Sequence, residues 1–282
     1  MTIFLDHIKY FDNYININIK LCLNFKIMSG VVKVERYYIP PDENEIENAF
    51  EQVRLFLKDN NASNIVLLTN TQDIGEDLEI FIDRKLRIPI NSLLRNPVHL
   101  SDITIRMESN RTFNRAMANN SAIIGFYPGK NMLDLLNDSK NALAIIIVPS
   151  IVDPYVEDWI DIWNPEVFGG QKGILNPLIE SCILKKGLET LTRLYGHSNH
   201  ELSNPDDKAN ATELLYRLNR SGEFLDPSLI RKWSIRNGWS SEGSYKLEDI
   251  AKSLNEGRRI RRNQNSWRSN LIEQFTEECE NE

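Results

Sequence analysis

The segment 121–150 constrains the fold most, because two short apolar runs flank a helical pattern within it. The runs are residues 122–127 and 142–148, and polar positions do not alternate in either. Such runs are typical of strands that are buried on both faces, as in a parallel sheet covered by helices. The segment therefore predicts a strand, a helix over 130–140 and a second, parallel strand.

The sequence before this segment repeats the pattern. Residues 31–38 and 65–69 are rich in β-branched and apolar side chains, and the apolar spacing between 46 and 57 predicts a helix that joins them. We therefore predict an α/β fold, a Rossmann-like three-layer domain with a mostly parallel sheet, over residues 29–170.

Amphipathic patterns after residue 170 predict helices without strands. The expected helices cover 177–195, 205–220, 227–237 and 247–254. We predict an α-helical C-terminal region over 171–262, followed by a charged tail over 263–282.

Residues 1–28 differ from the rest in composition, with many Ile, Asn, Lys, Phe and Tyr residues. Our hypothesis is that translation starts at Met28 and that the preceding residues are a non-native or unstructured extension. The alternative is an additional amphipathic strand over 14–25.

Composition excludes several classes of protein. The formal net charge is −7, and no apolar run approaches the roughly 18 residues of a membrane span. Cys22, Cys182 and Cys279 lie far apart without metal-ligand spacing. This pattern predicts a cytoplasmic protein without a disulfide framework, zinc site or membrane contact, and it leaves any cofactor unknown.

The most informative candidate site is the turn that contains Gly129, Lys130 and Asn131, between a strand and a helix N-terminus. Free N–H groups at such a terminus favour a small anion, and Lys130 adds a positive charge. The spacing matches neither a P-loop nor a dinucleotide fingerprint, so a purely conformational role for the glycine is the alternative.

Other polar clusters carry weaker predictions. His197 and His200 lie in one loop without a third ligand at metal-binding spacing, so we predict no metal site. Asp158 and Asp161 share a helical face, which fits acid–base chemistry or simply a solvated face. Catalytic residues stay unknown.

The arginines Arg258, Arg259, Arg261 and Arg262 form the clearest basic cluster. They could contact nucleic-acid phosphates, with Trp267 stacking on a base. We do not favour this reading, because the acidic residues after 272 could pair with them. The segment 238–246 also exceeds the turn of a helix-turn-helix motif.

We therefore expect a ligand-sensing or regulatory binding protein with a small anionic or nucleotide-like ligand at the carboxyl edge of the sheet. One alternative is an enzyme that acts on nucleotides or nucleic acid, with Asp73, Asp102 and Asp153 converging at this edge. Another is a protein-interaction scaffold whose partner surface contains Trp233, Trp239 and Trp267.

Overall fold

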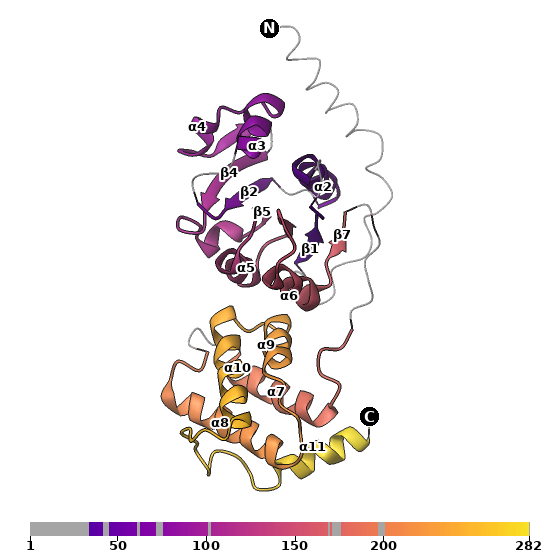
Figure 1. Ribbon diagram of the computed structural model, residues 1–282, viewed down its shortest axis with the longest axis vertical. Helices are drawn as coiled ribbons and strands as arrows, with labels where there is room; N and C mark the ends of the chain where they lie inside the picture. Colours follow the sequence, from indigo (N-terminus) through magenta and orange to yellow (C-terminus); the bar gives the residue numbers. More distant parts are fainter. Residues whose placement is uncertain are drawn as a thin grey trace.

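The computed structural model describes an α/β part followed by a helical part (Figure 1). The described residues are 34–41, 45–60, 63–71, 76–100, 103–168, 170, 176–196 and 201–281. The predicted extension 1–28, including Met28, lies outside them, as do Asp73, Asp102, His197 and His200.

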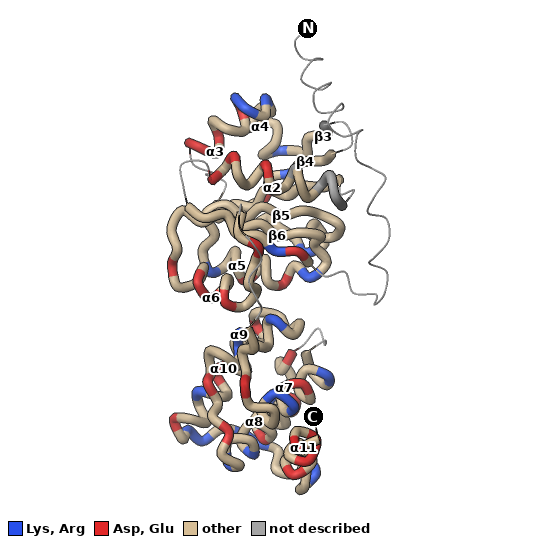
Figure 2. Tube along the Cα trace, turned by 90° about the vertical axis from the view of Figure 1, so that its right-hand side faces the viewer, with Lys and Arg blue, Asp and Glu red and all other residues tan. Residues whose placement is uncertain are grey.

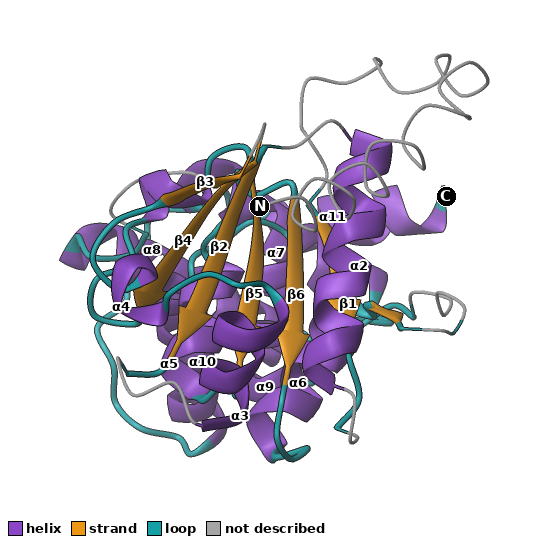
Figure 3. Cartoon of the chain, turned by 90° about the horizontal axis from the view of Figure 1, so that it is seen from above, coloured by secondary structure: helices purple, strands orange, loops and turns teal. Residues whose placement is uncertain are grey.

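Within the described residues the α/β part contains a seven-stranded, mostly parallel sheet of order β3-β4-β2-β5-β6-β1-β7. Its strands are β1 (Glu35–Tyr38), β2 (Asn64–Thr69), β3 (Val98–Leu100), β4 (Ile103–Ser109), β5 (Ser121–Phe126), β6 (Ala144–Val148) and β7 (Glu166–Val167). Only the β3–β4 pair is antiparallel. The predicted α/β fold class is confirmed, and the central strands end at one edge of the sheet (Figure 3).

Helices cover both faces of this sheet. One face buries side chains from α2 (Glu45–Asn60), α3 (Glu76–Ile80) and α4 (Ile90–Leu93). The other buries side chains from α5 (Lys130–Asn137) and α6 (Pro154–Trp163). Strands β5 and β6 are buried along their whole length, which explains why their sequences do not alternate.

The strand order differs from that of a Rossmann fold. The first strand of the chain, β1, lies between β6 and β7, next to one edge of the sheet. In a Rossmann fold, the first strand lies in the middle of the sheet. The chain leaves β2 towards the α3–α4 face and leaves the neighbouring β5 towards the α5 face. The carboxyl ends of β2 and β5 therefore form a topological switch point, a position where open sheets bind ligands, and those of β1 and β6 form another. We refer to the one at β2 and β5 as the switch point.

The helical part is built on its own hydrophobic cluster. Its helices are α7 (Cys182–Tyr195), α8 (Pro205–Arg220), α9 (Pro227–Arg236), α10 (Ser241–Asn255) and α11 (Leu271–Glu280). Trp239 is fully buried and Trp233 nearly so, and Trp267 packs against the same cluster. The prediction of a partner surface built on these tryptophans is wrong, because they form the interior.

Three predictions about this region are corrected by the structure. Helix α10 begins at Ser241, six residues before the predicted start. It has a glycine at position 243 because a Cβ there would collide with the Glu201 side chain. The expected charged tail contains α11, whose Phe275 is buried. A Cys182–Cys279 disulfide ties α11 to α7, contrary to the prediction of unpaired cysteines.

Candidate ligand site at the carboxyl edge of the sheet

The switch point is held together by one asparagine. Asn70 directly follows β2, and its side-chain amide donates to the carbonyl oxygen of Tyr127, which directly follows β5. The Asn70 Oδ1 atom accepts from the Gly129 N–H at 3.4 Å and from Asn110 Nδ2 at 3.1 Å. The ends of β2, β4 and β5 are thus linked through polar side chains. Asn110 Oδ1 is buried and has no hydrogen-bond partner in the described structure.

Tyr127 occupies a conformation that is unusual for its side chain. Its φ is 52°, in the left-handed region that costs a non-glycine residue roughly 1 kcal/mol or more. Burial raises the pKa of the Tyr127 phenol, and a hydrogen bond to Glu45 and the charge of Asp77 add to this increase. The phenol is therefore neutral and faces an acidic side of the switch point.

The turn predicted at Gly129 lies between β5 and α5. Gly129 is the N-cap of α5 and has no side chain to cap the first turn, so the N–H groups of Lys130 and Asn131 have no intrahelical acceptor. Asn131 is exposed. A small anion could therefore occupy the space before this helix.

Lys130 does not point back over the turn. Its ammonium pairs with Asp134 at 2.8 Å and lies 4.1 Å from the ring centre of Tyr245. Tyr245 in turn donates to Asp134 Oδ1 at 3.3 Å. Burial lowers the pKa of Lys130, but bonds to Asp134 and Tyr245 outweigh burial and leave its pKa above the ordinary value. Lys130 of the candidate ligand turn thus contacts the helical part directly.

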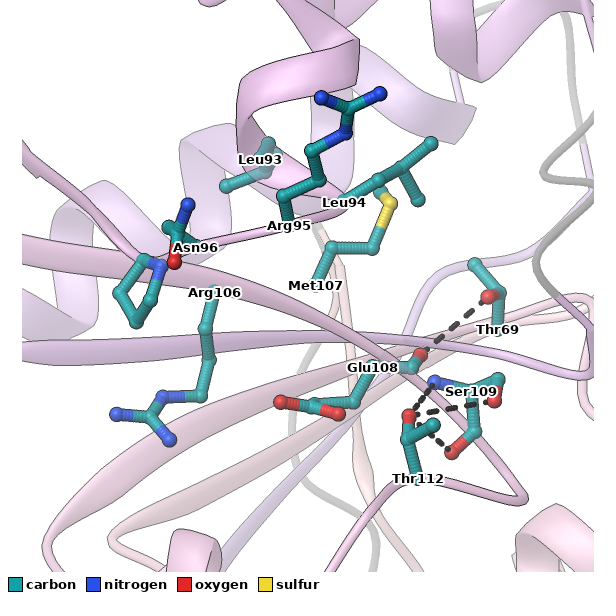
Figure 4. Close-up of a pocket in the computed structure, with 11 residues that line it drawn as sticks. Thr69, Leu93, Leu94, Arg95, Asn96, Arg106, Met107, Glu108, Ser109 and Thr112 are labelled. Atoms are coloured by element: carbon teal, nitrogen blue, oxygen red, sulfur yellow. Dashed lines mark hydrogen bonds between the residues drawn. The ribbon is translucent and has the colours of Figure 1, made fainter.

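A cavity of about 150 Å³ lies beside the switch point, at the ends of β2 and β4 (Figure 4). Three hydroxyl side chains form one wall and bond to each other or to backbone, with Ser109 N donating to Thr112 Oγ1 at 3.0 Å. Arg95 and Arg106 extend away from each other (Figure 4), and Glu108 lies near Arg106. This cavity therefore does not gather positive charge, and the turn at Gly129 stays the better anion candidate.

The predicted acidic residues have structural partners. Asp153 is the N-cap of α6 and accepts from the Tyr155 and Val156 N–H groups at 3.0 and 2.9 Å. Asp158 and Asp161 bind Lys232 of α9, both at 2.9 Å. They therefore join the two parts of the molecule. Among the described residues, no group of three or more His, Cys, Asp or Glu side chains could hold a metal ion.

The arginine cluster is partly engaged in the helical part. Arg262 pairs with Glu213 at 3.2 Å and stacks 3.5 Å from the ring centre of Tyr216. Arg261 pairs with Asp206 at 2.6 Å, and its side chain is 69% exposed. Arg261 and Arg262 therefore pair with α8, and Arg258 pairs with Glu256. We had expected the acidic end of the chain to supply these partners. Arg258 and Arg259 are exposed.

Sequence reasoning did not identify Asn70 and Asn110 as candidate site residues. Each directly follows a strand, β2 or β4, and this position was the available signal. Their mutual contact joins residues forty positions apart, which one sequence does not reveal.

The comparisons with known proteins bear only on the helical part. Residues 180–276 are similar to a family described as a domain of unknown function (DUF1889). This match spans α7 to α10 and about half of α11, and it does not include the α/β part. No curated protein and no solved structure matches the chain. In the part of the chain that the structure describes, no helix is long and apolar enough to cross a bilayer.

Proposed function

We propose that the chain is a ligand-sensing, regulatory binding protein. The α/β part binds a small anionic or nucleotide-like ligand at the first turn of α5, and the helical part responds. The observation that carries this proposal is the double role of Lys130. This residue belongs to the candidate ligand turn, which contains Gly129, Lys130 and Asn131, and its ammonium also contacts Tyr245 of α10. A ligand that attracts Lys130 competes with Asp134 for its ammonium.

The surroundings of Gly129 support a small ligand more than a macromolecule. The nearest described atom to a Cβ on Gly129, apart from its chain neighbours, would be Asn70 Oδ1 at 3.8 Å, so there is room beside this glycine for a small group. The neutral amides of Asn70 and Asn110 can bind polar groups without repelling an anion.

The alternatives have less support. For the enzyme, Asp153 is used as a helix cap, and Asp73 and Asp102 lie outside the described residues. For the scaffold, the proposed tryptophan surface is interior. A cytoplasmic location stays a prediction, which the redox state of the Cys182–Cys279 pair in cells would test.

The test is thermal unfolding of the full chain with inorganic phosphate and with nucleoside mono-, di- and triphosphates. A ligand at a hundred times its Kd should stabilise the fold by about 2.7 kcal/mol and raise Tm. The variant Lys130→Met should lose this response. Lys185→Met, which removes an exposed lysine of α7, should retain it. A full response in Lys130→Met, or no response of the wild type to any of these anions, would refute the proposal.

A further inference from the structure

The junction between the two parts is polar. Among the described residues, none of the three hydrophobic clusters contains side chains from both parts. Figure 2 shows acidic positions on α6 near the basic positions of α9 where the parts meet. Each part therefore has its own apolar core, and charged and polar side chains hold the parts together.

Helix α9 contributes three cations to this junction. Arg231 pairs with Asp158 at 2.5 Å, and Lys232 pairs with Asp158 and Asp161. Arg236 donates to the carbonyl oxygens of Asp161 and Ile162 at 2.7 and 2.6 Å. The side chains of Arg231 and Lys232 are only 10% and 11% exposed. Arg231 and Lys232 are thus almost fully covered, and their partners across the junction are carboxylates of α6.

The N-terminus of α10 contacts carboxylates of both parts, and the Ser240 N–H donates to Glu201 of the helical part at 2.8 Å. The Ser241 N–H donates to Asp138 Oδ1 at 2.8 Å, and the Ser241 hydroxyl donates to the Asp134 carbonyl oxygen at 3.2 Å. The turn between α9 and α10 is residues 237–240, four residues with Gly238 at φ 95°. This length is that of a helix-turn-helix turn, so our earlier argument against such a motif was wrong.

We propose that the basic face of α9 forms a binding surface for the phosphate backbone of duplex nucleic acid, which the α/β part masks. Arginine and lysine side chains are among the groups that contact DNA phosphates. Carboxylates of α6 occupy the corresponding positions in the docked state. Glu248 of α10 pairs with Arg231 at 3.1 Å within the helical part, so Arg231 keeps an acidic partner when the two parts separate, and Lys232 loses both of its partners.

This inference goes beyond the proposed function and needs no small ligand. It also concerns different residues from the arginine cluster at 258–262, which lies after the C-terminal end of α10. Because the α/β part covers this surface, nucleic acid can bind to it only when the two parts separate.

The test compares two double variants of the full chain that break the same ion pairs from opposite sides. Asp158→Asn with Asp161→Asn frees the cations of α9, whereas Arg231→Gln with Lys232→Gln removes two of them. Glu79→Gln with Asp83→Asn is the matched control, because it removes two exposed acids on the face of the sheet opposite to α5 and α6. Binding to a labelled DNA duplex is measured by fluorescence anisotropy, and opening by small-angle X-ray scattering.

The acid-side variant should open and bind DNA at least about tenfold more tightly than the wild type at low salt, with a salt slope steeper by about 0.9 for each freed phosphate contact. The cation-side variant should open without this gain. If the acid-side variant stays closed, Asp134→Asn and Asp138→Asn are added to it. An opened acid-side variant that binds no better than the control overturns the proposal, and so does equal binding by the cation-side variant.

Discussion

Lys130 and Tyr245 face each other between the two parts of the molecule, with the ammonium 4.1 Å from the ring centre. Lys130 is the first residue of α5 and belongs to the candidate ligand turn. Tyr245 is the fifth residue of α10. Asp134 binds both side chains. This contact connects the switch point of the sheet to the helical part through a chain of three side chains.

The first prediction concerns the energy of this contact. Lys130→Met and Tyr245→Leu should each weaken docking, and a double-mutant cycle should give a coupling energy of about 0.5–1 kcal/mol, as expected for a partly exposed cation–π pair. Docking is measured by scattering in a salt titration. Additive effects of the two substitutions would contradict a direct interaction.

The second prediction concerns the titration of Tyr127. The folded chain favours the protonated phenol, so its contribution to stability is complete below the ordinary pKa of 10.0 and is lost as pH rises above it. An absorbance titration of the wild type minus Tyr127→Phe should give a pKa above that value. Glu45→Gln should lower this pKa towards the ordinary value. Ionisation of Tyr127 near pH 10 in the native wild type would contradict the geometry.

The third prediction concerns the disulfide between Cys182 and Cys279, which are 97 residues apart. Reduction should lower the free energy of unfolding of the helical part by about 2–4 kcal/mol, because the unfolded chain regains a long unconstrained loop. Denaturant unfolding with and without reductant measures this change, and Cys182→Ser with Cys279→Ser should match the reduced wild type. An unchanged midpoint after complete reduction would contradict a stabilising role.

The fourth prediction compares how much Arg262 and the exposed pair Arg258 and Arg259 contribute to the stability of the fold. Arg262→Gln should cost about 1–2 kcal/mol of stability, because it removes one charged partner from the buried carboxylate of Glu213, which keeps Arg217. Arg258→Gln with Arg259→Gln should change stability by less than about 0.5 kcal/mol, because both side chains are exposed. Chemical denaturation compares the two, and equal destabilisation would contradict this assignment.

The central strands could be predicted because full burial leaves a local signature. Strands β5 and β6 consist of uninterrupted apolar residues, and the helix between them is amphipathic. The edge strands β3 and β7 are too short to show any periodicity. Helix α10 was predicted to start late, because Ser240 and Gly243 resemble a linker in sequence, whereas Ser240 is an N-cap in the structure.

The candidate site was predictable only in part. The turn at Gly129 follows from the strand–helix pattern, but the partners of Lys130 do not, because Tyr245 lies 115 residues further along the chain. Asp158 and Asp161 share a face, as predicted, yet their ion pairs reach α9. Contacts at such separations depend on how the two parts dock, which local patterns do not encode.

The most direct test of the ligand-sensing proposal is native mass spectrometry of the full chain after incubation with a mixture of nucleotides and inorganic phosphate. The account predicts a wild-type species that carries one anionic ligand per chain, lost on denaturation, and a much weaker adduct in Lys130→Met. Identical spectra for the wild type and Lys130→Met, whether both are free of ligand or both carry it, would contradict a site at the first turn of α5.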